Sequence, residues 1–275
     1  GSFTNSTSLT LCTYNPSPSD ITAGSVTLTL TAYGNPPCNP IISTKTLTIR
    51  RPMTAVAGTA ITTCSSAGAV NITAGSSATY HTIVTWTSSG TGTFTNPNSL
   101  TTCTYAPSAA DITAGSVTLT LTASNGGCTD VISTKTMTIS TLPTAVAGAA
   151  LSTCATAAAI NITGGSSATN QTGVTWTSSG TGTFTNANSL TLCTYNPSAA
   201  DKTAGSVTLT LTATGIAPCA NATSTKVLTI SRVMTAAAGT AISMCTSSAS
   251  VNITAGSTAT NHTTVTWTSS GTGTF

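Results

Sequence analysis

The sequence repeats itself, and this repetition limits the possible folds more than any other feature. The stretch Val84–Phe94, which reads VTWTSSGTGTF, returns as Val174–Phe184 and as Val265–Phe275, and the chain opens on the end of a further copy, Gly1–Phe3. The interval is about ninety residues, close to the size of one β-sandwich domain. We therefore expect two complete repeats between partial ones: the C-terminal part of a repeat at 1–51, complete repeats at 52–141 and 142–232, and the N-terminal part of a repeat at 233–275.

Short alternating segments within the repeat predict β-strands. In Ser116–Ala123 the apolar residues Val117, Leu119 and Leu121 alternate with threonines, which gives the strand one apolar and one hydroxyl face. Shorter segments of this kind lie at 53–64, 69–73, 82–86, 100–105 and 132–139. About seven short strands separated by turns are typical of an immunoglobulin-like sandwich. The predicted fold class is all-β, with tandem Ig-like β-sandwich repeats.

Aromatic residues make up only 4% of the chain, so the few that are present are expected in the cores. Gly90 and Gly92 allow the backbone to turn tightly between a tryptophan and a phenylalanine. We predict that the cores are built around the following anchors: Trp86, Trp176, Trp267, Phe94, Phe184, Tyr105 and Tyr195.

The segment before the clearest strand carries a helix signal. Ser108 and Asp111 have the S-x-x-D spacing of a capping box, and Gly115 suits the end of a short helix. The pattern recurs at equivalent positions as Ser17/Asp20/Gly24 and Ser198/Asp201/Gly205. Calcium is a less favoured interpretation of these aspartates, because it needs about 6–8 oxygen ligands and the whole chain has 4 acidic residues. A capped corner between two strands is the favoured one.

Charged residues are 4% of the chain and the net charge is +3. Such a chain offers no basic surface to nucleic acid or to an anionic membrane. The uncharged segment 141–160 contains Pro143, Gly148 and Cys154 and recurs with the repeat, so it is interpreted as two strands and a loop, not as a membrane span. We expect neither a nucleic-acid partner nor membrane insertion.

The residues that usually perform catalysis are scarce. All 4 acidic residues are aspartates, and the 2 histidines, His81 and His262, have no carboxylate or nucleophile at motif spacing. The 9 cysteines lack CxxC spacing, which argues against a zinc site. We therefore predict no catalytic residues, no metal site and no cofactor.

The cysteines fall into three sets of three and indicate an oxidising compartment. Because the opening and closing strands of a sandwich are expected to be neighbours, we predict the disulfides Cys64–Cys128 and Cys154–Cys219, each stabilising by about 4 kcal/mol in the chain-entropy model. Two cysteines are then left without a partner in this chain: Cys38 and Cys245. For the third set we keep three possibilities, which are a buried thiol, a link to a neighbouring chain and a different pairing: Cys12, Cys103 and Cys193.

Taken in order, these motifs resemble a known repeat family. They are Trp86, Gly90–Phe94, Tyr105–Leu121 and Cys128 ahead of a final strand. This set is similar to the PKD-like/Ig-like tandem repeats of giant cell-surface proteins of Bacteroidota, including gliding-motility-type adhesins exported by the type IX secretion system. The resemblance covers almost the whole chain and implies PKD-like/Ig-like sandwiches that form a stalk, without catalytic residues.

The sequence therefore favours a structural, non-enzymatic protein: the repeat region of an extracellular cell-surface adhesin stalk or fibre, in which short linkers join the repeats into an elongated rod. Its expected partners are further repeats or neighbouring copies of the same protein. One alternative is a self-assembling filament in which the partial repeat of one chain completes that of the next by strand complementation. Another is a glycan-binding repeat that uses its threonine face or its glycine-rich loop. Glycosylation of the chain itself is left open.

Overall fold

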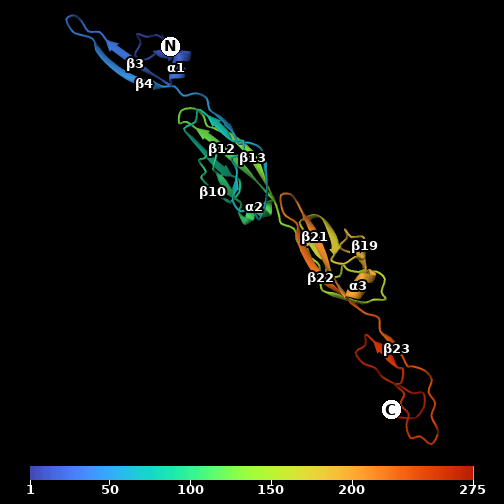
Figure 1. Ribbon diagram of the computed structural model, residues 1–275. Coiled ribbons are helices and arrows are strands. Elements are labelled where there is room, and N and C mark those ends of the chain that lie inside the picture. The colour runs from blue at the N-terminus through green and yellow to red at the C-terminus, as the bar shows by residue number, and fades with distance from the viewer. Residues whose placement is uncertain (275) are drawn as a thin grey trace. The chain divides into compact units, whose positions relative to one another are not determined.

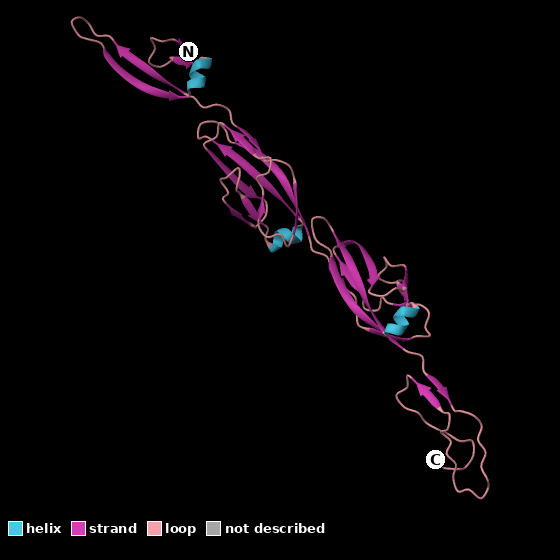
Figure 2. Ribbon diagram, viewed as in Figure 1, coloured by secondary structure: helices cyan, strands magenta, loops and turns pink. Residues whose placement is uncertain are grey.

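The computed structural model describes residues 1–274, and these residues form an all-β protein with three six-residue helices. The chain separates into two compact units, Gly1–Thr141 and Leu142–Phe275. Each unit contains one complete β-sandwich, drawn as groups of magenta strands in Figure 2 and labelled in Figure 1.

The sandwich of the first unit has two sheets and a separate strand pair. The larger sheet has the order β6 (Ile61–Cys64), β13 (Val131–Ser140), β12 (Ser116–Ser124) and β9 (Ile83–Ser88). The smaller sheet has the order β10 (Thr93–Thr95), β11 (Thr104–Ala106) and β7 (Val70–Asn71). The strand pair consists of β5 (Thr54–Val56) and β8 (Ser77–Thr79). The pairing of β6 with β13 is parallel, and the other pairings of this sandwich are antiparallel.

The core of this sandwich lies between the two sheets. On β12 the residues Val117, Leu119 and Leu121 are buried, because alternation turns them all to the inner face. Trp86 lies opposite Leu121 in the register between β9 and β12, and its side chain is 1% exposed. Tyr105 on β11 is fully buried and belongs to the same cluster. The side chains of both sheets therefore meet in one apolar layer.

A short helix, α2 (Ala109–Ala114), connects the two sheets. The Ser108 hydroxyl accepts a hydrogen bond from the backbone N–H of Asp111, the Asp111 carboxylate accepts one from the N–H of Ser108, and Gly115 ends the helix at φ 75°. This is the capping box that the S-x-x-D spacing predicts, with a glycine where the left-handed conformation is needed.

The sandwich of the second unit repeats this arrangement. Its sheet orders are β15-β22-β21-β18 and β16-β20-β19, and β14 pairs with β17. The capped helix between the sheets is α3 (Ala199–Ala204). The strands are β14 (Thr144–Val146), β15 (Leu151–Cys154), β16 (Ile160–Asn161), β17 (Ser167–Thr169), β18 (Gln171–Ser178), β19 (Thr183–Thr185), β20 (Thr194–Asn196), β21 (Ser206–Gly215) and β22 (Ala222–Ser231).

The remaining segments form smaller pieces of the same pattern. In the first unit, β1 (Ser2–Thr4) pairs with β2 (Thr13–Asn15), α1 (Pro18–Ala23) follows, and β3 (Ser25–Ala32) pairs with β4 (Ile41–Thr48). In the second unit, β23 (Thr235–Ala237) pairs with β24 (Thr258–Thr260). Among residues 1–274, no helix has the length and apolar character of a membrane span.

Candidate functional site

A buried aspartate occupies the corner between the two sheets. The side chain of Asp111 is 3% exposed. It accepts four hydrogen bonds, from the hydroxyl of Tyr105 (2.7 Å) and from the backbone N–H groups of Ser108, Gly92 and Thr91 (3.0 Å each). Gly92 must be a glycine, because a Cβ there would clash with the Tyr105 ring and with the carbonyl of Ala106. The Gly-Thr-Gly turn therefore brings its N–H groups to the carboxylate.

The electrostatics of this corner keep the aspartate ionised. Burial alone raises the pKa of Asp111, but the hydrogen bonds from Ser108, Tyr105 and Thr91 outweigh it, so the net effect is a lowered pKa. Burial and the hydrogen bond to Asp111 raise the pKa of Tyr105, although its hydrogen bond with Ser88 acts in the opposite direction. A carboxylate whose oxygens are occupied in this way stabilises the fold and is not available as a nucleophile or a base.

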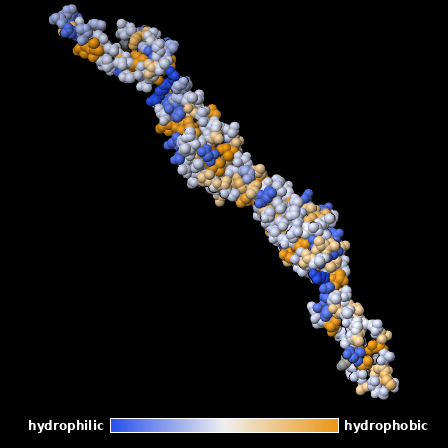
Figure 3. Space-filling model, in the orientation of Figure 1, coloured by the Kyte–Doolittle hydropathy of each residue, from blue (hydrophilic) through white to orange (hydrophobic). Residues whose placement is uncertain are grey.

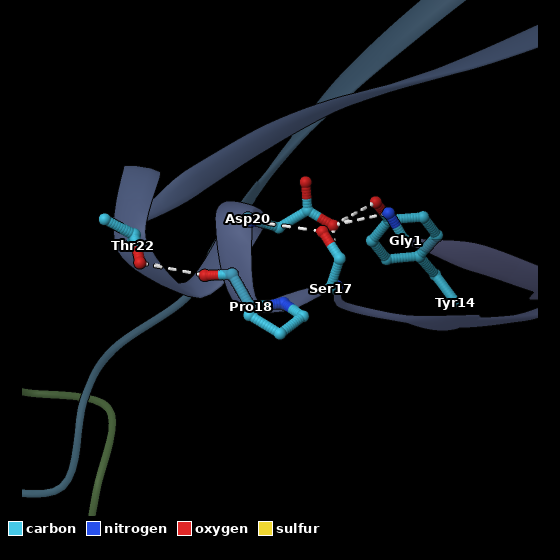
Figure 4. Close-up of polar contacts among 6 residues, drawn as sticks. All are labelled: Gly1, Tyr14, Ser17, Pro18, Asp20 and Thr22. Carbon is cyan, nitrogen blue, oxygen red and sulfur yellow. Dashed lines mark hydrogen bonds and ion pairs between the residues drawn. The ribbon is translucent and has the colours of Figure 1, made fainter.

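The other two copies of the corner show the same chemistry. Asp201 accepts from Tyr195, Ser198, Gly182 and Thr181 at 2.7–3.0 Å. In the first copy, shown in Figure 4, Asp20 accepts from the Tyr14 hydroxyl and the Ser17 N–H at 2.8 Å, and the Gly1 amine lies 2.8 Å from the same oxygen. The sequence predicted the helix caps and placed Tyr105 and Tyr195 in the cores, but it did not predict the hydrogen bond from each tyrosine hydroxyl to its aspartate. The signal that could have revealed it is a tyrosine six residues before each of these aspartates.

A lysine lies inside each complete core. On β13, Lys135 shares the inward face with Met137 and Ile139 and is 5% exposed. Its ammonium donates to the Ile72 carbonyl and lies 5.0 Å from the centre of the Trp86 ring. Lys226 makes the same two contacts with Ile162 and Trp176 in the second unit. Desolvation by burial lowers the pKa of Lys135 and of Lys226. The sequence analysis missed these lysines, although their inward position follows from the alternation along the strand.

Two of the cysteines left open by the sequence lie beside these lysines. Cys103 and Cys193 are fully buried free thiols. Burial raises the pKa of each to about 11, and the nearby Lys135 or Lys226 charge offsets this only in part. Protonated, inaccessible thiols of this kind are unreactive. Cys12, their counterpart in the first repeat, is an exposed free thiol.

The predicted intra-repeat disulfides are not formed. Cys128 and Cys154 are free thiols, whereas Cys64 and Cys219 are each disulfide-bonded. The reason is the direction of the strands. Because β6 runs parallel to β13, Cys64 lies opposite Ser140 at the far end of that strand, while Cys128 precedes its start. Twelve residues of extended chain separate the two ends by about 40 Å, far beyond the Cα separation of about 4.4–6.8 Å that a disulfide allows. Cys38 and Cys245 are exposed free thiols.

The predicted aromatic anchors differ in burial. Trp86, Trp176, Tyr105 and Tyr195 are at most 1% exposed. Phe94 and Phe184 are only partly buried, and each packs at a tilt against its tyrosine, with ring centres 4.7 and 4.8 Å apart and ring planes inclined by 52° and 51°. The indole of Trp267 is 38% exposed.

Within residues 1–274, no three His, Cys, Asp or Glu side chains lie close enough together to hold a metal ion. His81 lies at the start of the segment leading into β9, and His262 follows β24, each without a carboxylate partner among the ion pairs of this part of the chain. The surface in Figure 3 is mostly pale, with small separate blue and orange areas, as expected for 4% charged residues.

No protein-family model and no curated protein sequence matches the chain. Among solved structures, protocadherin gamma C5 EC1-3 is similar at TM-score 0.38 and 11% identity, covering 80% of this chain and 82% of its own. Domains 3-5 of Drosophila OTK give 0.42 and 12%, covering 71% and 67%. Titin domains I67-I69 give 0.39 and 14%, covering 70% of each chain. The strand orders and cores described above show that the chain consists of tandem Ig-like β-sandwich repeats.

Proposed function

We propose that this chain is a structural repeat region of an extracellular cell-surface adhesin, part of a stalk or fibre, without catalytic activity. The observation that carries the proposal is the repetition of one complete set of buried groups. Trp86, Tyr105, Asp111 and Lys135 have counterparts in the second unit that make the same contacts. A unit in which these buried groups contact one another within its own fold is suited to be a spacer in a tandem array.

One further observation supports the extracellular location, and another supports the assignment to an adhesin. Cys64 and Cys219 are disulfide-bonded, and structural disulfides persist mainly in oxidising compartments. The resemblance to Bacteroidota surface repeats supports the finer assignment to an adhesin of the gliding-motility type. Under this proposal the complete repeats span 52–141 and 142–232, and the flanking segments 1–51 and 233–275 belong to neighbouring repeats of the same protein.

The location is tested with antibodies raised against the 275-residue chain. Intact cells of the source organism should be labelled, and external protease should remove the label. Labelling that appears only after permeabilisation would refute the extracellular stalk.

A homotypic contact between neighbouring copies is a second candidate, favoured by the surface. Ile83 on the edge strand β9 is 57% exposed, and Ile132 on β13 is 65% exposed. Edge strands with exposed apolar residues and little charge tend to associate. Sedimentation velocity should show concentration-dependent association that Ile83→Lys weakens. A strictly monomeric wild type at every concentration removes this candidate.

A further inference from the structure

The first unit contains a pocket whose residues depart from the repeat. The pocket is open, has a volume of about 330 Å³ and is lined in part by Arg50, Arg51, Tyr80, His81 and Asn125. Arg50 and Arg51 are the only two adjacent cations among the 7 Lys and Arg residues of the sequence. Two of these residues, Tyr80 and Asn125, differ from their counterparts in the next repeat.

Tyr80 adopts a backbone conformation that disfavours it. Its φ is 56°, and its counterparts in the next two repeats, Asn170 and Asn261, have φ 54° and 55°. Asparagine tolerates this left-handed conformation, whereas a bulky residue rarely adopts it. The Asn170 amide also donates to the Leu142 carbonyl at 3.1 Å, and that of Asn261 donates to Val233 at 2.8 Å. A tyrosine cannot form this bond. Strain of this kind in a non-glycine residue is characteristic of functional positions.

Asn125 supports the strained backbone at Tyr80. It is 3% exposed, and its amide donates to the carbonyls of Tyr80 and Arg51, both at 3.2 Å. Its side-chain oxygen accepts from the N–H groups of Gly127 (3.2 Å) and Cys128 (3.0 Å). The counterpart of Asn125 in the second complete repeat is Gly215, which has no side chain. The substitutions at positions 80 and 125 are therefore coupled.

Within the described part of the chain, Arg50 and Arg51 bring positive charge without a carboxylate partner to this pocket. The Arg51 guanidinium lies 5.1 Å from the centre of the Tyr80 ring, and its Nη1 donates to the Tyr80 hydroxyl at 3.3 Å. The Arg50 side chain runs over Gly127, where a Cβ would clash with it. Neither guanidinium has a carboxylate partner within residues 1–274. Nδ1 of His81 is inaccessible to solvent and has no hydrogen-bond partner in the same part of the chain.

We propose that this pocket binds a carboxylate-bearing sugar residue of an acidic glycan. The Arg51 guanidinium, with donors to spare, is suited to hold the carboxylate in a two-pronged hydrogen bond. The Tyr80 ring, 55% exposed, offers an apolar face to the C–H groups of a sugar ring. The inference rests on the proposed adhesin function and gives its ligand class.

The test uses the full 275-residue chain and matched oligosaccharides. One arm carries a uronic acid, a second carries sialic acid, and in a third the carboxylates are converted to methyl esters. Calorimetric titration should show binding to at least one acid form, and the ester should bind about tenfold or more weakly, because a charge-assisted hydrogen bond is lost. The two acid arms decide which sugar is preferred. No binding to either acid, or equal binding of acid and ester, would overturn the proposal.

The variants are taken from the other repeats, so that each introduces a residue already accommodated at its position. Tyr80→Asn and Arg51→Thr should each weaken binding about tenfold or more, whereas Arg232→Thr, the equivalent change at the next linker, should leave it unchanged. Tyr80→Asn should also raise the midpoint of urea unfolding, because it relieves the strain. A purely structural role for Tyr80 predicts lower stability instead. Full binding by Tyr80→Asn and Arg51→Thr would contradict the assignment of the pocket. It would leave the proposed extracellular location untouched, because that is tested separately by antibody labelling of intact cells.

Discussion

Replacement of Asp111 by asparagine removes the charge at the centre of the corner while keeping the size of the side chain. The carboxylate accepts four hydrogen bonds, three of them on one oxygen. An amide group has a single acceptor oxygen, so at least one buried N–H group must face the amide N–H₂. Leaving a buried donor unpaired costs about 1–3 kcal/mol.

The three hydrogen bonds that remain also weaken, because hydrogen bonds to an ionised acceptor are roughly twice as strong as neutral ones. Relief of the desolvation of the charge offsets part of this loss. We expect Asp111→Asn to lower the free energy of unfolding of its repeat by about 3 kcal/mol. For a domain of this size, that corresponds to a fall in Tm of about 12–24 °C.

Scanning calorimetry of the full chain measures this effect, and Asp201→Asn serves as a replicate in the second unit. The matched control is Asp130→Asn, the same chemical change at an exposed aspartate, for which we expect a change within about 0.5 kcal/mol. If Asp111→Asn has the same Tm as Asp130→Asn, the hydrogen bonds of Asp111 do not stabilise the fold as argued.

Three other measurements follow from the structure. First, since the pKa values of Asp111 and Asp201 lie below the ordinary 3.8, their stabilisation is complete above pH 3.8 and is lost as the pH falls through the folded-state value; urea titrations should show this loss, and Asp111→Asn should remove the part that comes from the first unit. Second, burial lowers the pKa of Lys135 below its ordinary 10.5, so between the folded-state value and pH 10.5 the unfolded state binds more protons, and the stability of wild type relative to Lys135→Met should rise with pH across that interval; a difference that stays constant up to pH 10.5 would contradict this. Third, alkylation of the unfolded, non-reduced chain followed by peptide mass spectrometry should label Cys128 and Cys154 but not Cys64 and Cys219; labelled Cys64 would contradict the structure.

The parts of the fold that could be predicted from the sequence are those that depend on local patterns. The two-residue period of β12 places Val117, Leu119 and Leu121 on one face whatever their partners are, so the buried face of the strand could be predicted. The cap of α2 is equally local, since Ser108 and Asp111 are three residues apart. Predictions of this kind depend only on neighbours along the chain.

The parts that could not be predicted depend on how distant strands meet. Adjacency of the opening and closing strands says nothing about their direction, and the parallel pairing of β6 with β13 separates Cys64 from Cys128. The hydrogen bond between Tyr105 and Asp111 requires the turn at Gly92 to close over both. The sequence analysis does not single out Tyr80, because its left-handed backbone conformation is visible only in the structure.

The parallel pair of β6 and β13 has a mechanical consequence. The two strands lie near the beginning and the end of the repeat, and four register pairs join them, from Ile61 with Met137 to Cys64 with Ser140. Tension applied through the chain pulls neighbouring parallel strands past each other in opposite directions. Their hydrogen bonds are then loaded in shear and must break together, whereas an antiparallel hairpin pulled from its open end would release them one at a time. The parallel pairing in each complete repeat should therefore make the repeat resist unfolding when the chain is stretched.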